Sequence, residues 1–242
     1  MITGEKKIAL VLCGHGSRSQ SYKSDFFILK KKIQKKFKLL NIFHCFIEIN
    51  QPSVEMCLSD LMNEYKRIFF FPLLIFEGKH MIEDIKDKIN KISYDHPNKI
   101  TLIDKISLIK EVLPITSKII KEKYSQKFNT LITSCSISKK KEVKKELEIY
   151  TKKLSKLISI KKMVSHFVGD EGKVLNEINS HKIKENKCLI HPIFLFNGYL
   201  FEKNIKKFRS SIDVFNLHPI SHYEEIINLI SKKLIHTIQT LD

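Results

Sequence analysis

The sequence predicts an α/β protein made of two tandem halves, each a small parallel sheet flanked by helices. Short runs rich in Ile, Val, Leu and Phe alternate with longer lysine-rich segments of helical period, and this order occurs twice along the 242 residues. The short runs are apolar throughout, which is typical of parallel strands covered on both faces. Strands that alternate with helices in this way indicate βαβ units.

Four strands and four helices are predicted in the first half. The predicted strands are the apolar runs at residues 7–13, 42–49, 67–75 and 99–104. The predicted helices have apolar residues at helical spacing and occupy residues 19–39, 53–66, 81–92 and 107–123.

The second half has the same order of elements. Its predicted strands are residues 128–134, 163–168, 187–195 and 212–215. Its predicted helices are residues 138–157, 172–183, 200–208 and 218–238. The junction falls near residues 124–129, so we expect a first half at 1–125 and a second half at 126–242.

The duplication is also visible in individual residues. The segment FPLLIFEGKH at 71–80 is similar to HPIFLFNGYL at 191–200. At an offset of 192 − 72 = 120, the first segment's Pro72, Phe76 and Gly78 recur as Pro192, Phe196 and Gly198. Near the start of each half, Leu10 falls on Leu131, an offset of 131 − 10 = 121.

Polar residues of the first half are not repeated in the second. At these offsets the first-half residues and their counterparts are His15 and Ser136, Glu48 and Gly169, and His80 and Leu200. We therefore expect the active site in the first half, and we expect the degenerate second half to form the opposite wall of the cleft.

Composition restricts the class of protein. With 43% apolar residues the chain is long enough and apolar enough for a packed core. No apolar run approaches the roughly 18 residues that a membrane span needs, so we expect a cytoplasmic protein that does not enter a membrane. The five cysteines are far apart without a C-x-x-C pair, which favours buried reduced thiols.

The formal charge of +17 raises the question of a polyanionic partner. Lysine accounts for most of the 43 basic residues, and the arginines, which bind phosphates and guanines in fork geometry, are Arg18, Arg67 and Arg209. The lysines are spread over every predicted helix. A solvated lysine surface is the simpler interpretation, a polyanionic ligand is the alternative, and we do not expect nucleic-acid binding.

Three potential metal ligands are predicted at one edge of the first sheet. His15 follows the first strand, Glu48 lies at the end of the second, and His80 follows the third. The carboxyl ends of parallel strands face a common crevice, so these side chains are expected to lie near one another. Imidazole suits divalent cobalt, iron, nickel or zinc, and a carboxylate adds a harder oxygen ligand.

The loop around His15 has the residues that such a site needs. Gly14 and Gly16 permit a sharp turn and close approach of a bulky ligand to the imidazole. Ser17 is a candidate N-cap of the following helix, whose N-terminus can receive a carboxylate. Taken singly, a histidine after a strand is often a hydrogen-bonding residue and Glu48 could be a solvated strand end. Their predicted grouping favours function.

These segments resemble the signatures of the class II tetrapyrrole chelatases, the sirohydrochlorin cobalt and iron chelatases. The family's Gly-His-Gly-Ser-Arg loop is similar to GHGSR at 14–18, and its E-x-x-x-P-S segment to FIEINQPSVEM at 46–56. Its third loop, which contains G-x-H-x-x-x-D, is similar to PLLIFEGKHMIEDI at 72–85. The second half resembles the degenerate repeat of the long, two-domain members.

The resemblance implies a lyase-type enzyme that inserts a divalent metal into sirohydrochlorin without ATP. The metal, Co²⁺ or else Fe²⁺ or Ni²⁺, is a co-substrate, and no organic cofactor is implied. Cobaltochelatase activity in cobalamin biosynthesis is the favoured assignment, and ferrochelatase activity in sirohaem biosynthesis is the alternative. The family's metal-site residues, which are also its catalytic residues, fall on His15, His80 and Glu48.

The resemblance further implies where the tetrapyrrole binds. Sirohydrochlorin is a polycarboxylate, so Arg18 and the lysine-rich surface suit it. The implied substrate-binding residues are Ser17, Arg18, Gly78, Lys79, Asn197 and Tyr199, the last two on the opposing wall. Internal duplication supplies both walls within one chain, so we expect a monomer.

Two other functions fit parts of the sequence. In phosphohistidine phosphatases a nucleophilic histidine lies in an Arg-His-Gly triplet beside phosphate-binding arginines, but here Gly14 precedes His15 and arginines are few. A non-catalytic tetrapyrrole or metal carrier on a chelatase scaffold is the second alternative. Loss of His15 or His80 would have favoured it, and both are present.

Overall fold

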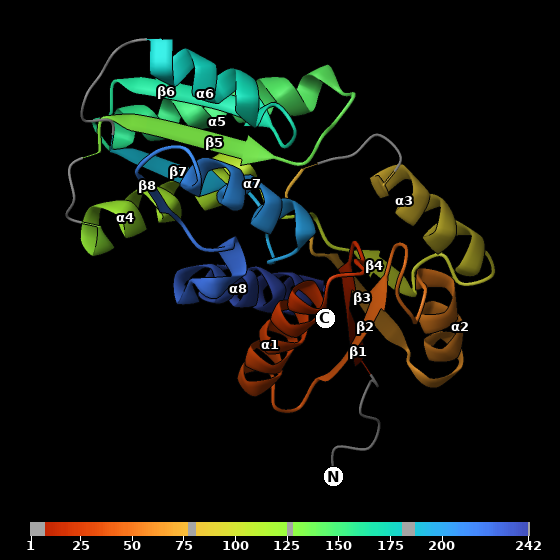
Figure 1. Cartoon of the computed structure of the whole chain (residues 1–242). Helices are drawn as coiled ribbons and strands as arrows, with labels where there is room; N and C mark the ends of the chain where they lie inside the picture. Colours follow the sequence, from red (N-terminus) through yellow and green to blue (C-terminus); the bar gives the residue numbers. More distant parts are fainter. Residues whose placement is uncertain (1–7, 77–80, 125–127, 181–186, 242) are drawn as a thin grey trace. The chain divides into compact units, whose positions relative to one another are not determined.

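The computed structural model describes residues 8–76, 81–124, 128–180 and 187–241 (Figure 1). It divides into two compact units, residues 1–106 with 227–242 and residues 107–226. Each unit holds one four-stranded sheet in which every pair of neighbouring strands is parallel. The predicted fold class, an α/β chain with two small parallel sheets flanked by helices, is confirmed.

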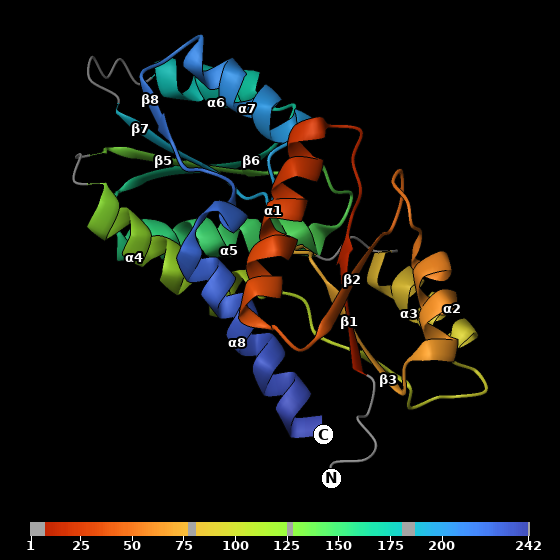
Figure 2. The same cartoon turned by 90° about the horizontal axis from the view of Figure 1, so that it is seen from below.

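The first unit has the strand order β2-β1-β3-β4. Its strands are β1 (Ile8–Gly14), β2 (Asn41–Phe46), β3 (Arg67–Pro72) and β4 (Ile100–Leu102). Its helices are α1 (Gln20–Lys36), α2 (Val54–Glu64), α3 (Met81–Ile92) and most of α8 (Glu224–Leu241). Figure 2 shows α2 and α3 on one face of this sheet and α1 on the other.

The second unit repeats this arrangement with the order β6-β5-β7-β8. Its strands are β5 (Thr130–Cys135), β6 (Lys162–Phe167), β7 (Cys188–Pro192) and β8 (Val214–Asn216). Its helices are α4 (Leu113–Lys123), α5 (Lys141–Leu157), α6 (Glu171–Ser180) and α7 (Tyr199–Arg209). In Figure 2, α6 and α7 cover one face of the sheet, and α4 and α5 cover the other.

The strand register reproduces the offsets found in the sequence. In the first sheet Leu10 pairs with Ile42 and Phe69. In the second sheet Leu131 pairs with Met163 and Leu189. The differences, 131 − 10 = 121, 163 − 42 = 121 and 189 − 69 = 120, match the offsets of the sequence repeat.

Apolar side chains fill both faces of each sheet, as the uninterrupted apolar runs predict. The cluster of the first unit that includes Val11 and Phe70 of the sheet packs against Leu58 of α2 and Ile85 of α3. On the other face Phe26 of α1 is buried and its ring lies 4.9 Å from that of Phe46. Burial on two faces leaves the carboxyl-end loops as the exposed part of each strand–helix crossover.

Three elements have limits that differ from those predicted, and a proline lies at each of these limits. The strands β3 and β7 were expected to continue to residues 75 and 195, but they end at Pro72 and Pro192. The helix predicted over 107–123 begins as a wide turn, η1 (Leu108–Val112), in which the amide of Val112 donates to the carbonyl of Ser107. Pro114, which lacks an amide donor, follows at the start of α4.

The last helical segment of each predicted half, 1–125 or 126–242, is assigned to the compact unit that contains the sheet of the other half. Residues 107–123 belong to the unit that contains the second sheet, and residues 227–242 belong to the unit that contains the first. Lys36 of α1 donates a 2.9 Å hydrogen bond to Asn228 of α8 within that first unit. The boundaries of the sequence repeat therefore match the two sheets, whereas the boundaries of the compact units depend on which helices pack together.

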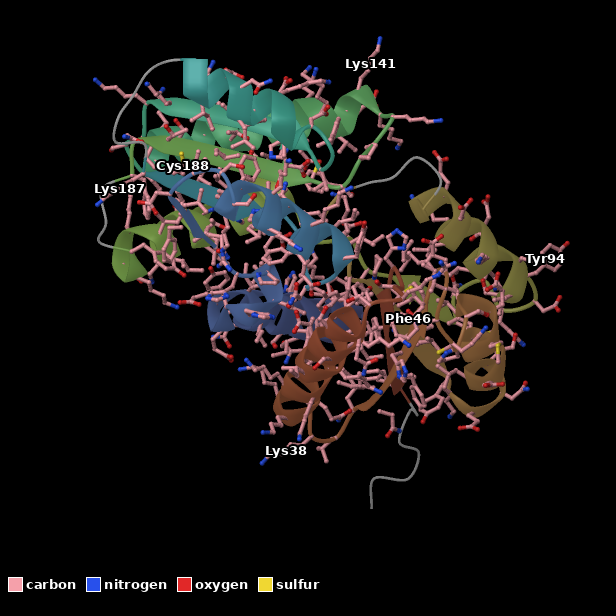
Figure 3. The ribbon with its side chains drawn as sticks, in the orientation of Figure 1. Lys38, Phe46, Tyr94, Lys141, Lys187 and Cys188 are labelled. Atoms are coloured by element: carbon pink, nitrogen blue, oxygen red, sulfur yellow. The ribbon has the colours of Figure 1, made fainter. Side chains whose placement is uncertain are left out.

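The composition predicts exposed lysines and buried cysteines, and both are found in the structure. Lys38 and Lys141 extend outward from the ribbon, and both are exposed (Figure 3). All five cysteines are buried and free of disulfide bonds. In the parts of the chain that the structure describes, no helix is both long and apolar enough to span a bilayer.

Candidate functional site

Two loops at the carboxyl edge of the first sheet carry those predicted site residues of the first unit that the structure describes. His15, Ser17 and Arg18 lie between β1 and α1, and Glu48 lies between β2 and α2. The third predicted loop, with Gly78, Lys79 and His80, lies outside the described residues.

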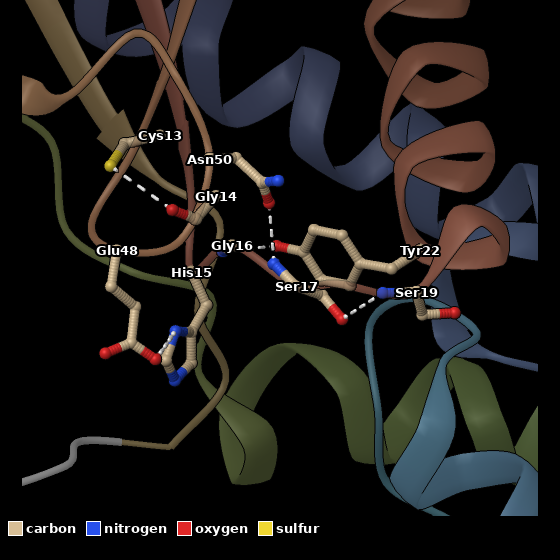
Figure 4. Close-up of polar contacts among 9 residues, drawn as sticks. All are labelled: Cys13, Gly14, His15, Gly16, Ser17, Ser19, Tyr22, Glu48 and Asn50. Carbon is tan, nitrogen blue, oxygen red and sulfur yellow. Dashed lines mark hydrogen bonds and ion pairs between the residues drawn. The ribbon is translucent and has the colours of Figure 1, made fainter.

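His15 and Glu48 face each other across these two loops. Nδ1 of His15 lies 3.2 Å from Oε1 of Glu48, and their side chains are 43% and 55% exposed. Nδ1 itself is shielded from solvent. Figure 4 shows the Glu48 carboxylate beside the His15 imidazole, with a dashed line from Nδ1 to the carboxylate. A carboxylate at Nδ1 favours the proton there, which leaves the lone pair on Nε2 for a ligand.

Backbone hydrogen bonds hold the two loops in register beyond the strands. The amide of Ile47 donates to the carbonyl of Gly14 and the amide of Glu48 donates to that of His15, each at 3.0 Å. These bonds continue the parallel ladder of β1 and β2 past its last paired residues. The facing of His15 and Glu48 is therefore set by the backbone.

Gly16 has a conformation and a position that other residues fit poorly. Its φ is +102°, and a Cβ there would lie 1.8 Å from the carbonyl oxygen of Glu48. Gly14 is restricted by packing, because a Cβ would lie 2.9 Å from Phe26 and from the Tyr22 hydroxyl. The sequence interpretation assigned both glycines to a sharp turn and to ligand approach. The positive φ of Gly16 agrees with the turn, whereas the observed neighbours of both glycines are parts of the protein.

Asn50 and Tyr22 support the loop and were not identified from the sequence. Oδ1 of Asn50 accepts a 2.7 Å hydrogen bond from the amide of Ser17. The hydroxyl of Tyr22 accepts a 3.2 Å hydrogen bond from the amide of Gly16 (Figure 4). Burial raises the pKa of Tyr22 to about 12, so its hydroxyl stays protonated at neutral pH. Asn50 lies two residues after Glu48 in a turn, a position where asparagine commonly bonds backbone amides.

Ser17 does not have the predicted N-cap position. The helix α1 begins at Gln20 and its N-cap residue is Ser19, whose side chain makes no capping hydrogen bond. Ser17 instead accepts a 3.1 Å hydrogen bond from the amide of Ser19 through its hydroxyl. The prediction was wrong because the turn after Gly16 uses two more residues before the helix starts. Arg18 is exposed in this turn.

Asn197 and Tyr199 belong to the second unit and follow β7 at the carboxyl edge of its sheet. Oδ1 of Asn197 accepts a 2.9 Å hydrogen bond from the amide of Gly198. Tyr199 starts α7 and its side chain is 67% exposed.

A buried polar network lies at this edge of the second sheet. Nδ2 of Asn204 donates to Glu171 at 3.0 Å, and Ser134 donates to Oδ1 of Asn204 at 3.0 Å. Burial by itself would raise the pKa of Glu171, but hydrogen bonds from its own backbone amide, from Gly169 and from Asn204 lower it overall. These bonds join β5 to α6 and α7, so the network stabilises the fold of the second unit.

Metal-ligand geometry is incomplete in the part of the chain that the structure describes. Over residues 8–76, 81–124, 128–180 and 187–241, no three side chains of His, Cys, Asp or Glu form a group that could hold a metal ion. His15 and Glu48 form a pair, and the third predicted ligand, His80, lies outside these ranges.

Solved structures share this fold over nearly the whole chain. SirB from Bacillus subtilis with Fe³⁺ is 19% identical with a TM-score of 0.77, over 96% of this chain and 95% of that one. The sirohydrochlorin chelatase SirB from Bacillus subtilis subspecies spizizenii in complex with cobalt is 18% identical with a TM-score of 0.73, over 92% and 91%. CbiX, the terminal enzyme for biosynthesis of siroheme in denitrifying bacteria, is 8% identical with a TM-score of 0.66, over 94% and 98%.

The fold is therefore that of the class II chelatases. Residues 9–123, which include His15, Glu48 and the three signature segments, match the family model described as CbiX. Over these residues the chain is similar to the CbiX family. A comparison with curated protein sequences finds no match.

Proposed function

We propose that this protein is a sirohydrochlorin chelatase, which inserts a divalent metal ion into sirohydrochlorin without ATP. The observation that carries the proposal is the His15–Glu48 pair, in which Nδ1 of the imidazole lies 3.2 Å from the carboxylate. The pair lies within the residues that match CbiX. Two solved structures of the same fold are described as sirohydrochlorin chelatase SirB with cobalt and as SirB with Fe³⁺, which supports the same chemistry here.

His15 binds the incoming cation through Nε2 in this proposal, and His80 is the second ligand. Glu48 lies at Nδ1 of the same imidazole, 3.2 Å away, so in the metal-free protein it orients the ring. A carboxylate behind a metal-binding histidine fixes the ring and raises the basicity of the other nitrogen. Two imidazoles leave several coordination positions of the metal open, so that the ring nitrogens can replace water ligands one by one.

Metal insertion has to balance charge and protons. The cation forms bonds to the pyrrole nitrogens and two N–H protons leave the macrocycle. Glu48 is 55% exposed and already adjoins His15, so it is placed to accept a proton directly. No redox step is required, because the metal and the ring keep their oxidation states.

The remaining predicted residues are proposed to bind the substrate's carboxylates and ring. Arg18 is exposed beside the His15 loop, and Ser17 lies next to it. Gly78 and Lys79 are proposed to contribute from the loop that carries His80. Asn197 and Tyr199 are proposed contacts from the edge of the second sheet, where Tyr199 exposes its ring. The net charge of +17 suits a polycarboxylate.

Anaerobic mixing of the protein with sirohydrochlorin and Co²⁺, Fe²⁺ or Ni²⁺ tests the proposal. The visible spectrum should change faster than in a protein-free control. Glu48→Gln should lower kcat/KM about 10- to 100-fold, and His15→Ala and His80→Ala should each lower it further. Glu64→Gln, an exposed residue at the end of α2, is the matched control and should have full activity. Insertion at the uncatalysed rate by the unaltered protein would reject the enzyme.

Co²⁺ is the favoured metal and cobalamin biosynthesis the favoured pathway, with Fe²⁺ and sirohaem as the alternative. The SirB structures with Fe³⁺ and with cobalt and the CbiX structure described for siroheme biosynthesis support both. Rates measured with both metals present at equal concentration distinguish them. A carrier would bind sirohydrochlorin or the metal without accelerating insertion, so a binding measurement beside the rate separates that alternative.

A further inference from the structure

Ile49, the residue after Glu48, has a backbone conformation that isoleucine rarely adopts. Its φ is +67°, in the left-handed region, where a β-branched side chain is strained. The side chain is also 57% exposed, so burial in the core does not compensate for the strain. A large apolar side chain that is both strained and exposed needs another reason for its position.

Contacts on both sides impose this conformation on the backbone. The amide of Asn50 donates a 2.7 Å hydrogen bond to the carbonyl of Glu48, across Ile49. The same carbonyl is the atom against which Gly16 packs, and Oδ1 of Asn50 accepts the amide of Ser17. The turn at Ile49 therefore joins the Glu48 loop to the His15 loop. The backbone needs a residue that tolerates positive φ here, and glycine or asparagine would be the unstrained choice.

The corresponding loop of the second unit differs at this position. The loop after β6 corresponds to the loop after β2, and at the offset of 121 between these strands Glu48 falls on Gly169 and Ile49 falls on Asp170. Gly169 has a φ of +114°, whereas Asp170 does not have positive φ. Positive φ at Ile49 is therefore particular to the first loop.

We propose that Ile49 is a substrate contact, whose side chain packs against the conjugated ring of the tetrapyrrole while Glu48 faces His15. This inference rests on the proposed function. The macrocycle is apolar over its faces and anionic at its rim, so an exposed aliphatic group next to the metal-binding pair fits its face, and the exposed Arg18 of the His15 loop suits its rim. Covering the side chain with the ring removes apolar surface from water, which favours binding.

Replacement of Ile49 separates a substrate contact from a structural role. Ile49→Asn fits the left-handed region and lacks the apolar surface, so its Tm should equal or exceed that of the unaltered protein. Its Kd for metal-free sirohydrochlorin, followed by absorbance, should rise about three- to tenfold. Ile49→Leu keeps the apolar surface and should restore binding. Leu39→Asn, in the α1–β2 turn at the opposite edge of the sheet, where Leu39 is fully exposed, is the matched control and should leave Kd unchanged.

The outcomes of this experiment are distinct. If Ile49→Asn binds sirohydrochlorin as tightly as the unaltered protein, the contact is disproved and the proposed function stands. If the unaltered protein neither binds nor metallates sirohydrochlorin, the proposed function fails and the contact with it. Should Ile49→Asn fail to fold, Ile49→Gly, which also suits positive φ, takes its place with the same expected loss of affinity.

Discussion

Single residues determine the shape of the loop that holds His15. Gly16 has positive φ and lies directly against the Glu48 carbonyl. A side chain at this position would therefore displace the loop that carries Glu48. Asn50 links the same two loops through its side chain. The geometry of the His15–Glu48 pair therefore depends on residues that do not themselves bind a ligand.

We expect Gly16→Ala to destabilise the protein and to reduce metal insertion. Positive φ costs a non-glycine residue about 1–2 kcal/mol, and the contact of a Cβ with the Glu48 carbonyl, at 1.8 Å, adds to this cost. Urea unfolding and initial rates measure the two effects. Gly172→Ala is the control, because a Cβ at Gly172 in α6 meets no atom within 4 Å. It should be neutral or stabilise by up to about 1 kcal/mol. Equal effects of the two changes would contradict this account.

At the scale of elements, the helices after β1 and β2 start differently. The side chain of Ser53 caps α2 by accepting the amide of Met56 at 3.2 Å. Ser19 has the N-cap position of α1 without a capping hydrogen bond from its side chain. The sequence pattern placed the helix starts within a few residues, but it assigned the first cap to Ser17. The choice between Ser17 and Ser19 depends on how the chain leaves the sheet after Gly16.

We expect Ser53→Ala to lower the free energy of unfolding by about 1 kcal/mol. The loss arises because the amide of Met56 would no longer have its side-chain acceptor. Ser19→Ala, at a cap position without that bond, should have a smaller effect. Thermal and urea unfolding of both variants provide the comparison, and a larger loss from Ser19→Ala would show that the caps are assigned wrongly.

For the whole molecule, buried histidines link stability to pH. Burial lowers the pKa of His191 to about 3, and its Nε2 lies 2.9 Å from the Tyr150 hydroxyl. Burial also lowers the pKa of His166. These imidazoles are neutral in the folded protein, whereas the unfolded chain binds protons near the ordinary histidine pKa. The contribution of these neutral imidazoles to the free energy of unfolding is therefore complete above about pH 6.5. It decreases as the pH falls toward the pKa that each histidine has in the folded protein.

We expect His191→Gln to reduce the acid sensitivity of the second unit. At about pH 5 the buried imidazole should cost about 2 kcal/mol relative to neutral pH, and glutamine removes this dependence because it does not titrate. Urea unfolding between about pH 7 and pH 5 measures the slope for each protein. His96→Gln, at an exposed position in the α3–β4 connection, is the control and should retain the full slope. An unchanged slope in His191→Gln would refute the assignment.

The sequence predicted most of the fold because the relevant signals are local. Uninterrupted apolar runs such as 7–13 predicted strands buried on both faces, and β1 is buried from Ala9 onward. The pairing of Leu10 and Leu131 predicted the duplication that the strand registers reproduce. The predicted parallel strands also placed His15 and Glu48 at one edge of the sheet, since parallel strands bring their carboxyl ends together.

Other features were decided by tertiary structure. The apolar pattern along the sequence determined which residues form strands and helices, and the alternation of these elements determined which loops share an edge of the sheet. It could not determine that the terminal helices would pack with the unit of the other sheet, that Asn50 and Tyr22 would hold the His15 loop, or that Ile49 would take positive φ. Periodicity records which face of an element is apolar, whereas the partner of that face depends on contacts between residues far apart in the chain, which no local pattern contains.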